Sequence, residues 1–218
     1  MKQFGLLVFD WDGTVADSLH HIVWAMQAAI IEVGLPVRTR EQILAIIGLG
    51  MHEAALELYP DADSATRRQM VQSYGQYYLQ ATTGNTVLFA DARATLERLQ
   101  EQGYVLAVAT GKSRRGLDRA FAETGVKHYF QASRCADETV SKPHPQMLIE
   151  LMQTLDIPAE QTLMIGDSHY DLLMATNAGV SSAAVNYGAQ PASRLLEYHP
   201  LTTLNRLGEL PLWLNNLS

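Results

Sequence analysis

The feature that most constrains this fold is a set of short apolar runs that lack polar alternation. They lie at 4–9, 104–109, 162–165 and 182–185. Such runs suit strands that are buried on both faces, as in a parallel sheet. Segments with helical spacing separate them, at 92–102, 114–123, 145–155 and 171–178, and 132–136 reads as a further short strand. Repeated strand–helix units with short loops predict a parallel sheet that is covered by helices.

The stretch that follows the first apolar run breaks this rhythm. Helical spacing recurs at 19–33, 40–47, 52–58 and 64–80, and no strand pattern occurs there. We therefore predict an α/β fold with a Rossmann-like parallel sheet core, helices on both faces and an inserted all-helical domain. The core is expected at 1–17 and 84–218, the insertion at 18–83, and a last packed helix around 211–214.

Composition excludes several classes of protein. The 23 acidic residues outnumber the 16 basic ones, and the net charge of −7 disfavours a nucleic-acid or anionic-membrane surface. The single cysteine, Cys135, cannot form an internal disulfide or a cysteine-based zinc cluster. No run approaches the roughly 18 apolar residues of a membrane span, and the N-terminus does not read as a signal peptide. The expected location is the cytoplasm.

Polar residues follow the predicted strands where each strand ends. The first strand ends in Asp10-Trp11-Asp12-Gly13-Thr14, and later segments contain Thr110-Gly111-Lys112, Ser141-Lys142-Pro143 and Gly166-Asp167 with Asp171. In open parallel sheets, ligands bind at the carboxyl edge of the strands. We expect four carboxylates, a lysine and a hydroxyl to gather at that edge.

This set of groups suits phosphoryl transfer. Clustered carboxylates require a cation, and oxygen-only ligands favour Mg²⁺. A divalent ion beside a lysine neutralises a phosphoryl group, and an ionised aspartate can attack phosphorus. A second carboxyl group two residues later can protonate the leaving oxygen and then activate water. Gly13 would let backbone amides approach the phosphate, while Thr14 or Thr110 would donate hydrogen bonds to it.

At these residues the sequence resembles the haloacid dehalogenase (HAD) superfamily, and its phosphoglycolate phosphatase-like and β-phosphoglucomutase-like members in particular. The resemblance covers nearly the whole chain, and it makes residues 18–83 the helical cap. It implies that Asp10 is the nucleophile, that Asp12 is the general acid and base, and that Thr110 and Lys142 hold the phosphoryl group. It also implies that Mg²⁺ is bound by the Asp10 carboxylate, the Asp12 backbone carbonyl and Asp167, with Asp171 in support.

The resemblance leaves several reactions open. The preferred prediction is hydrolysis of a small-molecule phosphate ester, as in phosphoglycolate phosphatase; a sugar phosphomutase, a pyrophosphatase and a non-catalytic binding module are alternatives. The expected substrate-binding residues are Gly13, Thr14, Thr110, Gly111 and Lys142, with Gly48, His52 and Glu53 as cap candidates and Arg38 or Arg40 as others. The 48–53 loop lacks the arginine and serine of the mutase relatives, which disfavours mutase activity. The cap has no lysine, although the phosphonate-cleaving relatives need one there to form a Schiff base, which disfavours that activity as well. A monomer or a homodimer is expected.

Overall fold

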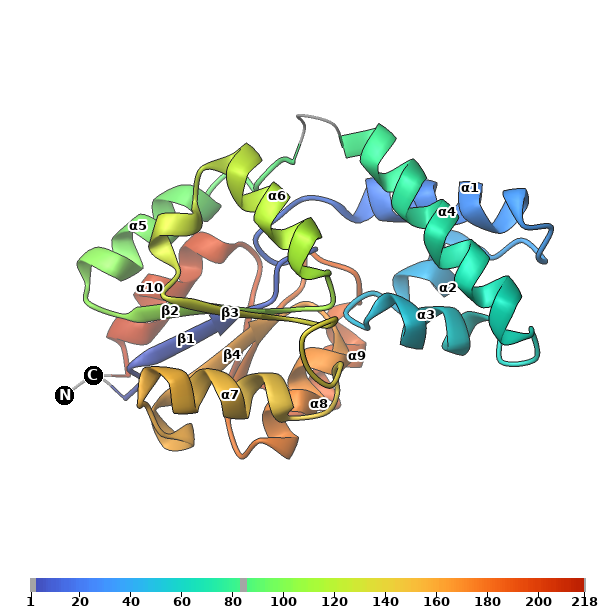
Figure 1. Ribbon diagram of the computed structural model, residues 1–218. Coiled ribbons are helices and arrows are strands. Elements are labelled where there is room, and N and C mark those ends of the chain that lie inside the picture. Colours follow the sequence, from blue (N-terminus) through green and yellow to red (C-terminus); the bar gives the residue numbers. More distant parts are fainter. Residues whose placement is uncertain (1–2, 83–85, 218) are drawn as a thin grey trace.

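The computed structural model describes residues 3–82 and 86–217, and its core is a six-stranded parallel sheet (Figure 1). The strand order is β3-β2-β1-β4-β5-β6, so β1 lies in the interior between β2 and β4. The strands are β1 (Leu6–Phe9), β2 (Val105–Thr110), β3 (Ala132–Cys135), β4 (Thr162–Gly166), β5 (Ser181–Val185) and β6 (Thr202–Leu204). This arrangement confirms the predicted fold class.

Successive side chains of β1 point to opposite faces of the sheet, as the pleat requires. Leu7 and Phe9 pack into a core with helices on one face, whereas Leu6 and Val8 pack into a second core on the other. The helices on the first face are α5 (Ala92–Glu101), α6 (Arg114–Thr124) and α10 (Leu210–Asn215); those on the second are α7 (Gln146–Leu155), α8 (His169–Asn177) and α9 (Ala192–Leu196) (Figure 1). Burial on both faces explains why the strands carry no polar alternation.

The inserted segment forms a separate helical unit beside the carboxyl edge of the sheet (Figure 1). Its helices are α1 (Leu19–Glu32), α2 (Arg40–Leu44), α3 (Met51–Leu58) and α4 (Ser64–Thr82). They share an apolar core that includes Met26, Ile30 and Met70. On the core side, Ala16 bridges Leu88, so the two connections to the insertion run side by side. The predicted boundary between residues 83 and 84 lies outside the described residues.

The structure adds short elements that the sequence pattern did not reveal. Strand β6 and helix α9 were not predicted, and three 3-10 turns occur at η1 (Lys127–Tyr129), η2 (Ala159–Gln161) and η3 (Leu207–Glu209). Strand β6 has only three residues at the sheet edge, and edge strands of this length carry too little pattern to be recognised. Among the described residues, no helix combines the length and apolar character needed to cross a membrane.

Candidate active site

The carboxyl ends of three adjacent strands bring the predicted catalytic residues together. Phe9 is in register with Val108 of β2 and Ile165 of β4, so the next residues of all three strands lie at one edge. Asp10 follows β1, Thr110 ends β2 and Asp167 follows β4. The Asp10 amide donates to the Ile165 carbonyl at 2.9 Å, which fixes the backbone at this edge. The parallel sheet therefore positions the site.

Lys142 lies between two carboxylates at this edge. Its Nζ is 2.8 Å from Asp10 Oδ1 and 2.6 Å from Asp171 Oδ1, and all three side chains are buried. Burial would lower the pKa of Lys142, but the two neighbouring carboxylates raise it above the ordinary lysine range. This lysine, on the loop between β3 and α7, is therefore held as a buried ammonium.

Asp10 itself has an incompletely satisfied carboxylate. The Lys142 ammonium lies 2.8 Å from Oδ1, but among the described residues no hydrogen bond reaches Oδ2. Burial raises the pKa of Asp10 to about 7, Lys142 opposes the shift, and the charge of Asp171 adds to it. A buried carboxylate with an open oxygen is a group that a cation or a phosphoryl group would complete.

Asp167 is oriented by two donors. Its Oδ1 accepts from the Thr14 hydroxyl at 3.2 Å, and its Oδ2 accepts from the Ala189 amide at 2.6 Å. Gly13 has a φ of 79°, and a Cβ there would lie 2.1 Å from Asp167 Oδ2, so the close approach requires glycine. Burial, and then the nearby Asp10 and Asp171, raise the pKa of Asp167 well above its usual value.

Gly13 and Thr14 make contacts within the protein as well. The Gly13 amide donates to the Ala16 carbonyl at 2.9 Å, while the Thr14 hydroxyl is used on Asp167. Both residues therefore shape the turn after β1 and place Asp167. Their predicted contact with the phosphate stays a prediction.

The acidic cluster fits a divalent cation. Carboxylate oxygens of Asp10, Asp167 and Asp171 lie within 4.8 Å of one another, and Lys142 supplies the only ammonium seen to contact the cluster in the described chain. Three carboxylates beside one lysine leave an excess of negative charge, and oxygen-only donors suit Mg²⁺. Asp171 is the least available ligand, because its Oδ1 bonds Lys142 and its Oδ2 accepts from the Ser168 amide and hydroxyl.

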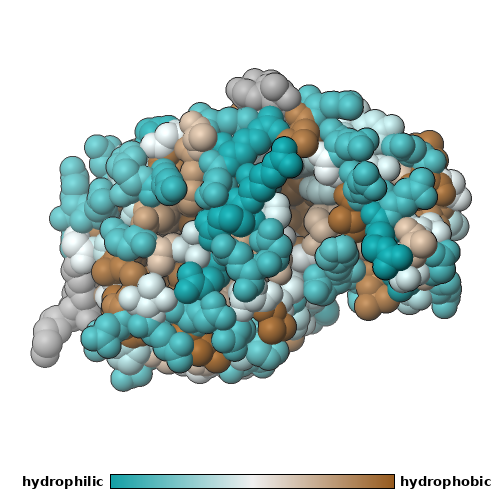
Figure 2. All heavy atoms as spheres, viewed as in Figure 1, coloured by the Kyte–Doolittle hydropathy of each residue, from teal (hydrophilic) through white to brown (hydrophobic). Residues whose placement is uncertain are grey.

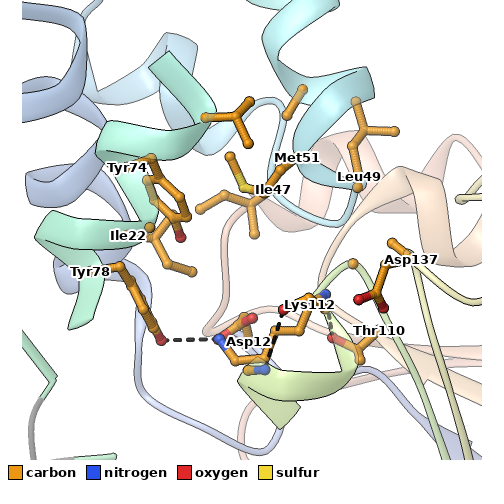
Figure 3. Close-up of a pocket in the computed structure, with 18 of the residues that line it drawn as sticks. Asp12, Ile22, Ile47, Leu49, Met51, Tyr74, Tyr78, Thr110, Lys112 and Asp137 are labelled. Atoms are coloured by element: carbon orange, nitrogen blue, oxygen red, sulfur yellow. Dashed lines mark hydrogen bonds and ion pairs between the residues drawn. The ribbon is translucent and has the colours of Figure 1, made fainter. Parts of the chain in front are cut away.

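Asp12 is held by residues that sequence reasoning missed. Its Oδ1 accepts from the Ser18 hydroxyl at 2.5 Å and from Lys112 Nζ at 2.9 Å. Ser18 immediately precedes α1, but its hydroxyl makes no capping bond with that helix. Lys112 also donates to the Tyr78 hydroxyl of α4 at 3.0 Å, so it joins the two units (Figure 3). A lysine two residues after Thr110, at the same strand end, was the signal in the sequence.

The loop before α3 rests directly on the core. A Cβ on Gly111 would lie 2.4 Å from the Leu49 carbonyl oxygen. The Gly50 amide donates to the Ser141 hydroxyl at 2.8 Å, and a Cβ on Gly48 would lie 2.6 Å from Ser168 Oγ. Glycines on both sides therefore permit backbone contact between this loop and the carboxyl edge of the sheet.

A cavity of about 730 Å³ lies between the two units. Asp10, Asp12 and Thr110 form part of its floor, and the predicted cap candidates Gly48, His52 and Glu53 also line it. Figure 3 shows the side chains of α4 and of the 47–51 segment facing this floor. Its volume falls within the range of about 300–1,000 Å³ that is typical of ligand pockets.

The expectation that Arg38 or Arg40 faces the substrate requires a correction. Neither arginine is among the residues that line the cavity. The Arg38 guanidinium lies 4.4 Å from the centre of the Tyr59 ring and donates to the Leu58 carbonyl at 2.6 Å. Arg38 therefore stabilises the end of α3 inside the helical unit.

The fold and the site together define a class: a parallel α/β hydrolase whose aspartate-rich sheet edge is covered by an inserted helical unit. A family model described as haloacid dehalogenase-like hydrolase matches residues 7–185. The chain therefore belongs to the haloacid dehalogenase-like hydrolase family and is an enzyme. The matched region includes every predicted site residue, which confirms the family that the sequence motifs indicated.

Curated relatives match almost end to end. A phosphoglycolate phosphatase of Vibrio cholerae is 28% identical over 218 residues, covering 96% of each chain. A protein of Dickeya dadantii named "Probable phosphatase IndB" is 32% identical, covering 94% of this chain and 91% of its own. Among solved structures, a haloacid dehalogenase-like hydrolase from Bacteroides fragilis has a TM-score of 0.88 at 27% identity, covering 95% of this chain and 99% of its own.

Proposed function

We propose that this protein is a Mg²⁺-dependent phosphatase that hydrolyses a small-molecule phosphomonoester through an aspartyl-phosphate on Asp10. The observation that carries the proposal is the Asp10 carboxylate, buried at the sheet edge beside Lys142 with no hydrogen bond to its Oδ2 among the described residues. The phosphatase names of the two curated relatives support the same reaction class. Phosphoglycolate is the substrate that the first of these names offers for testing.

In the first half-reaction, a carboxylate oxygen of Asp10 attacks the phosphorus. The new bond joins Asp10 to phosphorus, and the bond between phosphorus and the leaving oxygen breaks. Asp12, two residues further along the turn, gives its proton to that oxygen, so the leaving group departs as an alcohol. Lys142 and the Thr110 hydroxyl bind phosphoryl oxygens, where an ammonium and a hydroxyl offset the developing charge.

In the second half-reaction, Asp12 removes a proton from water. The water oxygen attacks the phosphorus of the aspartyl-phosphate, inorganic phosphate forms, and the bond to Asp10 breaks to restore the carboxylate. Ser18 and Lys112 hold Asp12 through both steps. Asp12 therefore serves as acid first and as base second.

The cation would be held by the Asp10 carboxylate, the Asp12 backbone carbonyl and Asp167. When bound, Mg²⁺ supplies charge neutralisation for the phosphoryl oxygens. Asp171 keeps Lys142 in position through the 2.6 Å contact and supports the ion indirectly. Residues 18–83 act as the cap, because the 48–50 loop and α4 cover the floor of the cavity.

A non-catalytic binding module is the alternative from another class. Such proteins retain the fold but lose a catalytic group, whereas this chain retains Asp10, Asp12, Lys142, Asp167 and Asp171. The arrangement of these groups around one open carboxylate favours the enzyme.

Release of inorganic phosphate from p-nitrophenyl phosphate with Mg²⁺ tests the proposal. We expect turnover by the wild type and a loss of at least about a thousandfold in Asp10→Asn, because an amide cannot act as the nucleophile. Asp61→Asn, at an exposed position of the helical unit, is the matched control and should retain full activity. Equal turnover by Asp10→Asn and wild type would disprove the mechanism.

A further inference from the structure

The walls of the cavity above Asp10 differ sharply in character. The floor is charged, but the wall facing it comes from the helical unit and is largely apolar, as the hollow in Figure 2 and the labelled side chains of Figure 3 show. This wall includes Ile22, Ile47, Leu49, Met51 and Tyr74. A wall of this kind contacts the part of the substrate that leaves, because the phosphoryl group is held on the floor.

Several of these groups are kept away from water by the surrounding structure. Ile22 and Ile47 are 7% and 5% exposed and pack together in one cluster. The rings of Tyr74 and Tyr78 stack with centroids 5.6 Å apart, and burial raises the pKa of Tyr74 above the usual tyrosine range. The wall is therefore preformed as an apolar surface rather than assembled from mobile surface side chains.

Among the described residues, the cap wall carries no lysine or arginine that could pair with an anionic leaving group. The described cap residues with polar side chains that line the cavity are His52, Glu53, Gln72, Tyr74, Gln76 and Tyr78. On the core side, Lys112 already pairs with Asp12, and Arg119 pairs with Glu123 at 2.7 Å. Arg115 lies on α6 at the exposed rim. A carboxylate or a second phosphate against the apolar side chains Ile22, Ile47 and Leu49 would lose hydration without a lysine or arginine of the cap to pair with it.

Size points in the same direction. The cavity of about 730 Å³ is many times larger than the roughly 30 Å³ that one water molecule occupies in the liquid. A two-carbon acid would leave most of this space filled with water against apolar side chains. A ring or a chain of several carbons would displace that water and cover the wall.

We infer that the physiological leaving group is a neutral, largely apolar alcohol of at least ring size, and not a small acid such as glycolate. This inference rests on the proposed phosphatase function and specifies its substrate class. The phosphoryl group binds at Asp10 and Thr110 on the floor of the cavity, and the apolar body lies against Ile47, Leu49 and Tyr74. Phosphate ester hydrolysis then releases the apolar alcohol and inorganic phosphate.

Alkyl phosphates with similar leaving groups test the inference. We would measure kcat/KM with Mg²⁺ for ethyl phosphate, hexyl phosphate, 2-phenylethyl phosphate and phosphoglycolate. Burial of each added methylene should raise kcat/KM by roughly fourfold until the wall is covered. We expect 2-phenylethyl phosphate and hexyl phosphate to exceed ethyl phosphate by at least tenfold, and phosphoglycolate to be the poorest of the four.

A matched pair of variants tests the wall directly. Met51→Gln places an amide in the wall and should lower the ratio of kcat/KM for 2-phenylethyl over ethyl phosphate severalfold. Met152→Gln makes the same exchange on α7, where the side chain packs against the sheet and does not line the cavity. This variant should leave the ratio of kcat/KM values unchanged.

The outcomes separate the inference from the function. Turnover in which phosphoglycolate equals or exceeds the apolar esters would overturn the inference while the phosphatase function stands. No turnover of any of the four esters or of p-nitrophenyl phosphate would overturn the proposed function, and the inference with it.

Discussion

Lys112 Nζ lies 2.9 Å from Asp12 Oδ1, and the same ammonium donates to the Tyr78 hydroxyl of the helical unit at 3.0 Å. Only 9% of the Lys112 side chain is exposed, so this pair is screened little by solvent. Burial would lower the pKa of Lys112, but Asp12 raises it, and the lysine remains charged. The residue proposed as general acid and base is therefore oriented by a contact that also reaches the cap.

Replacement of Lys112 by methionine should impair turnover. Asp12 would keep its bond to Ser18 but lose the second contact that fixes its carboxylate. Because correctly placed acid–base catalysis contributes about 10² to 10⁴ in rate, we expect kcat to fall by roughly tenfold to a hundredfold with a smaller change in KM. Steady-state kinetics on p-nitrophenyl phosphate would measure both constants.

Two further variants separate the contact with Asp12 from the other effects of replacing Lys112. Tyr78→Phe removes only the hydroxyl on the cap side and should reduce kcat less than the loss of Lys112 does. Lys127→Met, at an exposed lysine, controls for loss of one positive charge. If Lys112→Met retained the wild-type kcat, Lys112 would have no role in positioning Asp12.

Magnesium should stabilise the folded protein as well as support activity. A ligand at 100 times its Kd that binds only the native state adds about 2.7 kcal/mol to the free energy of unfolding. We expect this gain on adding Mg²⁺ to chelated protein, and loss of most of it in Asp167→Asn. Thermal unfolding followed by circular dichroism would measure it, with Asp61→Asn as control. Undiminished turnover in excess EDTA would contradict the metal requirement.

The buried Asp10 carboxyl group predicts an unusual pH dependence of stability. Its pKa rises from 3.8 to about 7 on burial, so the native state keeps a proton that the unfolded chain has released between these values. The free energy of unfolding of the metal-free protein should therefore fall as pH rises through this window, by up to roughly 4 kcal/mol in all. Urea unfolding in EDTA at several pH values would show the decline.

Asp10→Asn provides the complementary measurement. The amide carries no charge at any pH, so the variant should show a flatter profile and exceed the wild type in stability near pH 8 without metal. Residual slope is expected because burial also raises the pKa of Asp167. If the variant were less stable than the wild type at that pH, the loss of stability at high pH could not be assigned to ionisation of Asp10.

Contact of the 48–50 loop with the core depends on Gly111. A Cβ there would lie 2.4 Å from the Leu49 carbonyl and 2.8 Å from that of Gly48, so Gly111→Ala must push the loop away. We expect KM to rise on the order of tenfold, because the arrangement in which the loop rests on the core becomes less populated. Gly5→Ala is the matched control, since its nearest neighbour would be a Gln161 side-chain atom at an ordinary 3.6 Å. Equal KM values for the two variants would argue against a role for loop contact.

The sequence predicted the sheet core because strands that are buried on both faces consist of nearly continuous apolar residues. Runs such as Leu6–Phe9 and Thr162–Gly166 have no polar residue facing solvent, and the helices between them show a clear period. The insertion was predicted from a change in the spacing of apolar residues after the first strand, where helical spacing replaces the alternation of strands and helices. Short edge elements such as β6 lacked enough residues to carry such a signal.

The positions of the motif residues followed from one topological rule. Asp10, Thr110 and Asp167 each end or follow a strand, and parallel strands share a carboxyl edge. The contacts between these side chains and the groups around them did not follow from this rule. Lys142 pairing with both Asp10 and Asp171 depends on how a loop folds over the edge, and no local pattern encodes that distance.

By itself, then, the sequence determined the α/β core, the inserted helical segment and the polar residues that gather at the carboxyl edge of the sheet, since each depends on local pattern and on strand ends. Only the tertiary structure decided how the cap meets that edge. The link from Lys112 to Tyr78 and the apolar wall around Ile47 join residues far apart in the chain. Such contacts arise from the packing of two units against each other, so no run of residues shows them in advance.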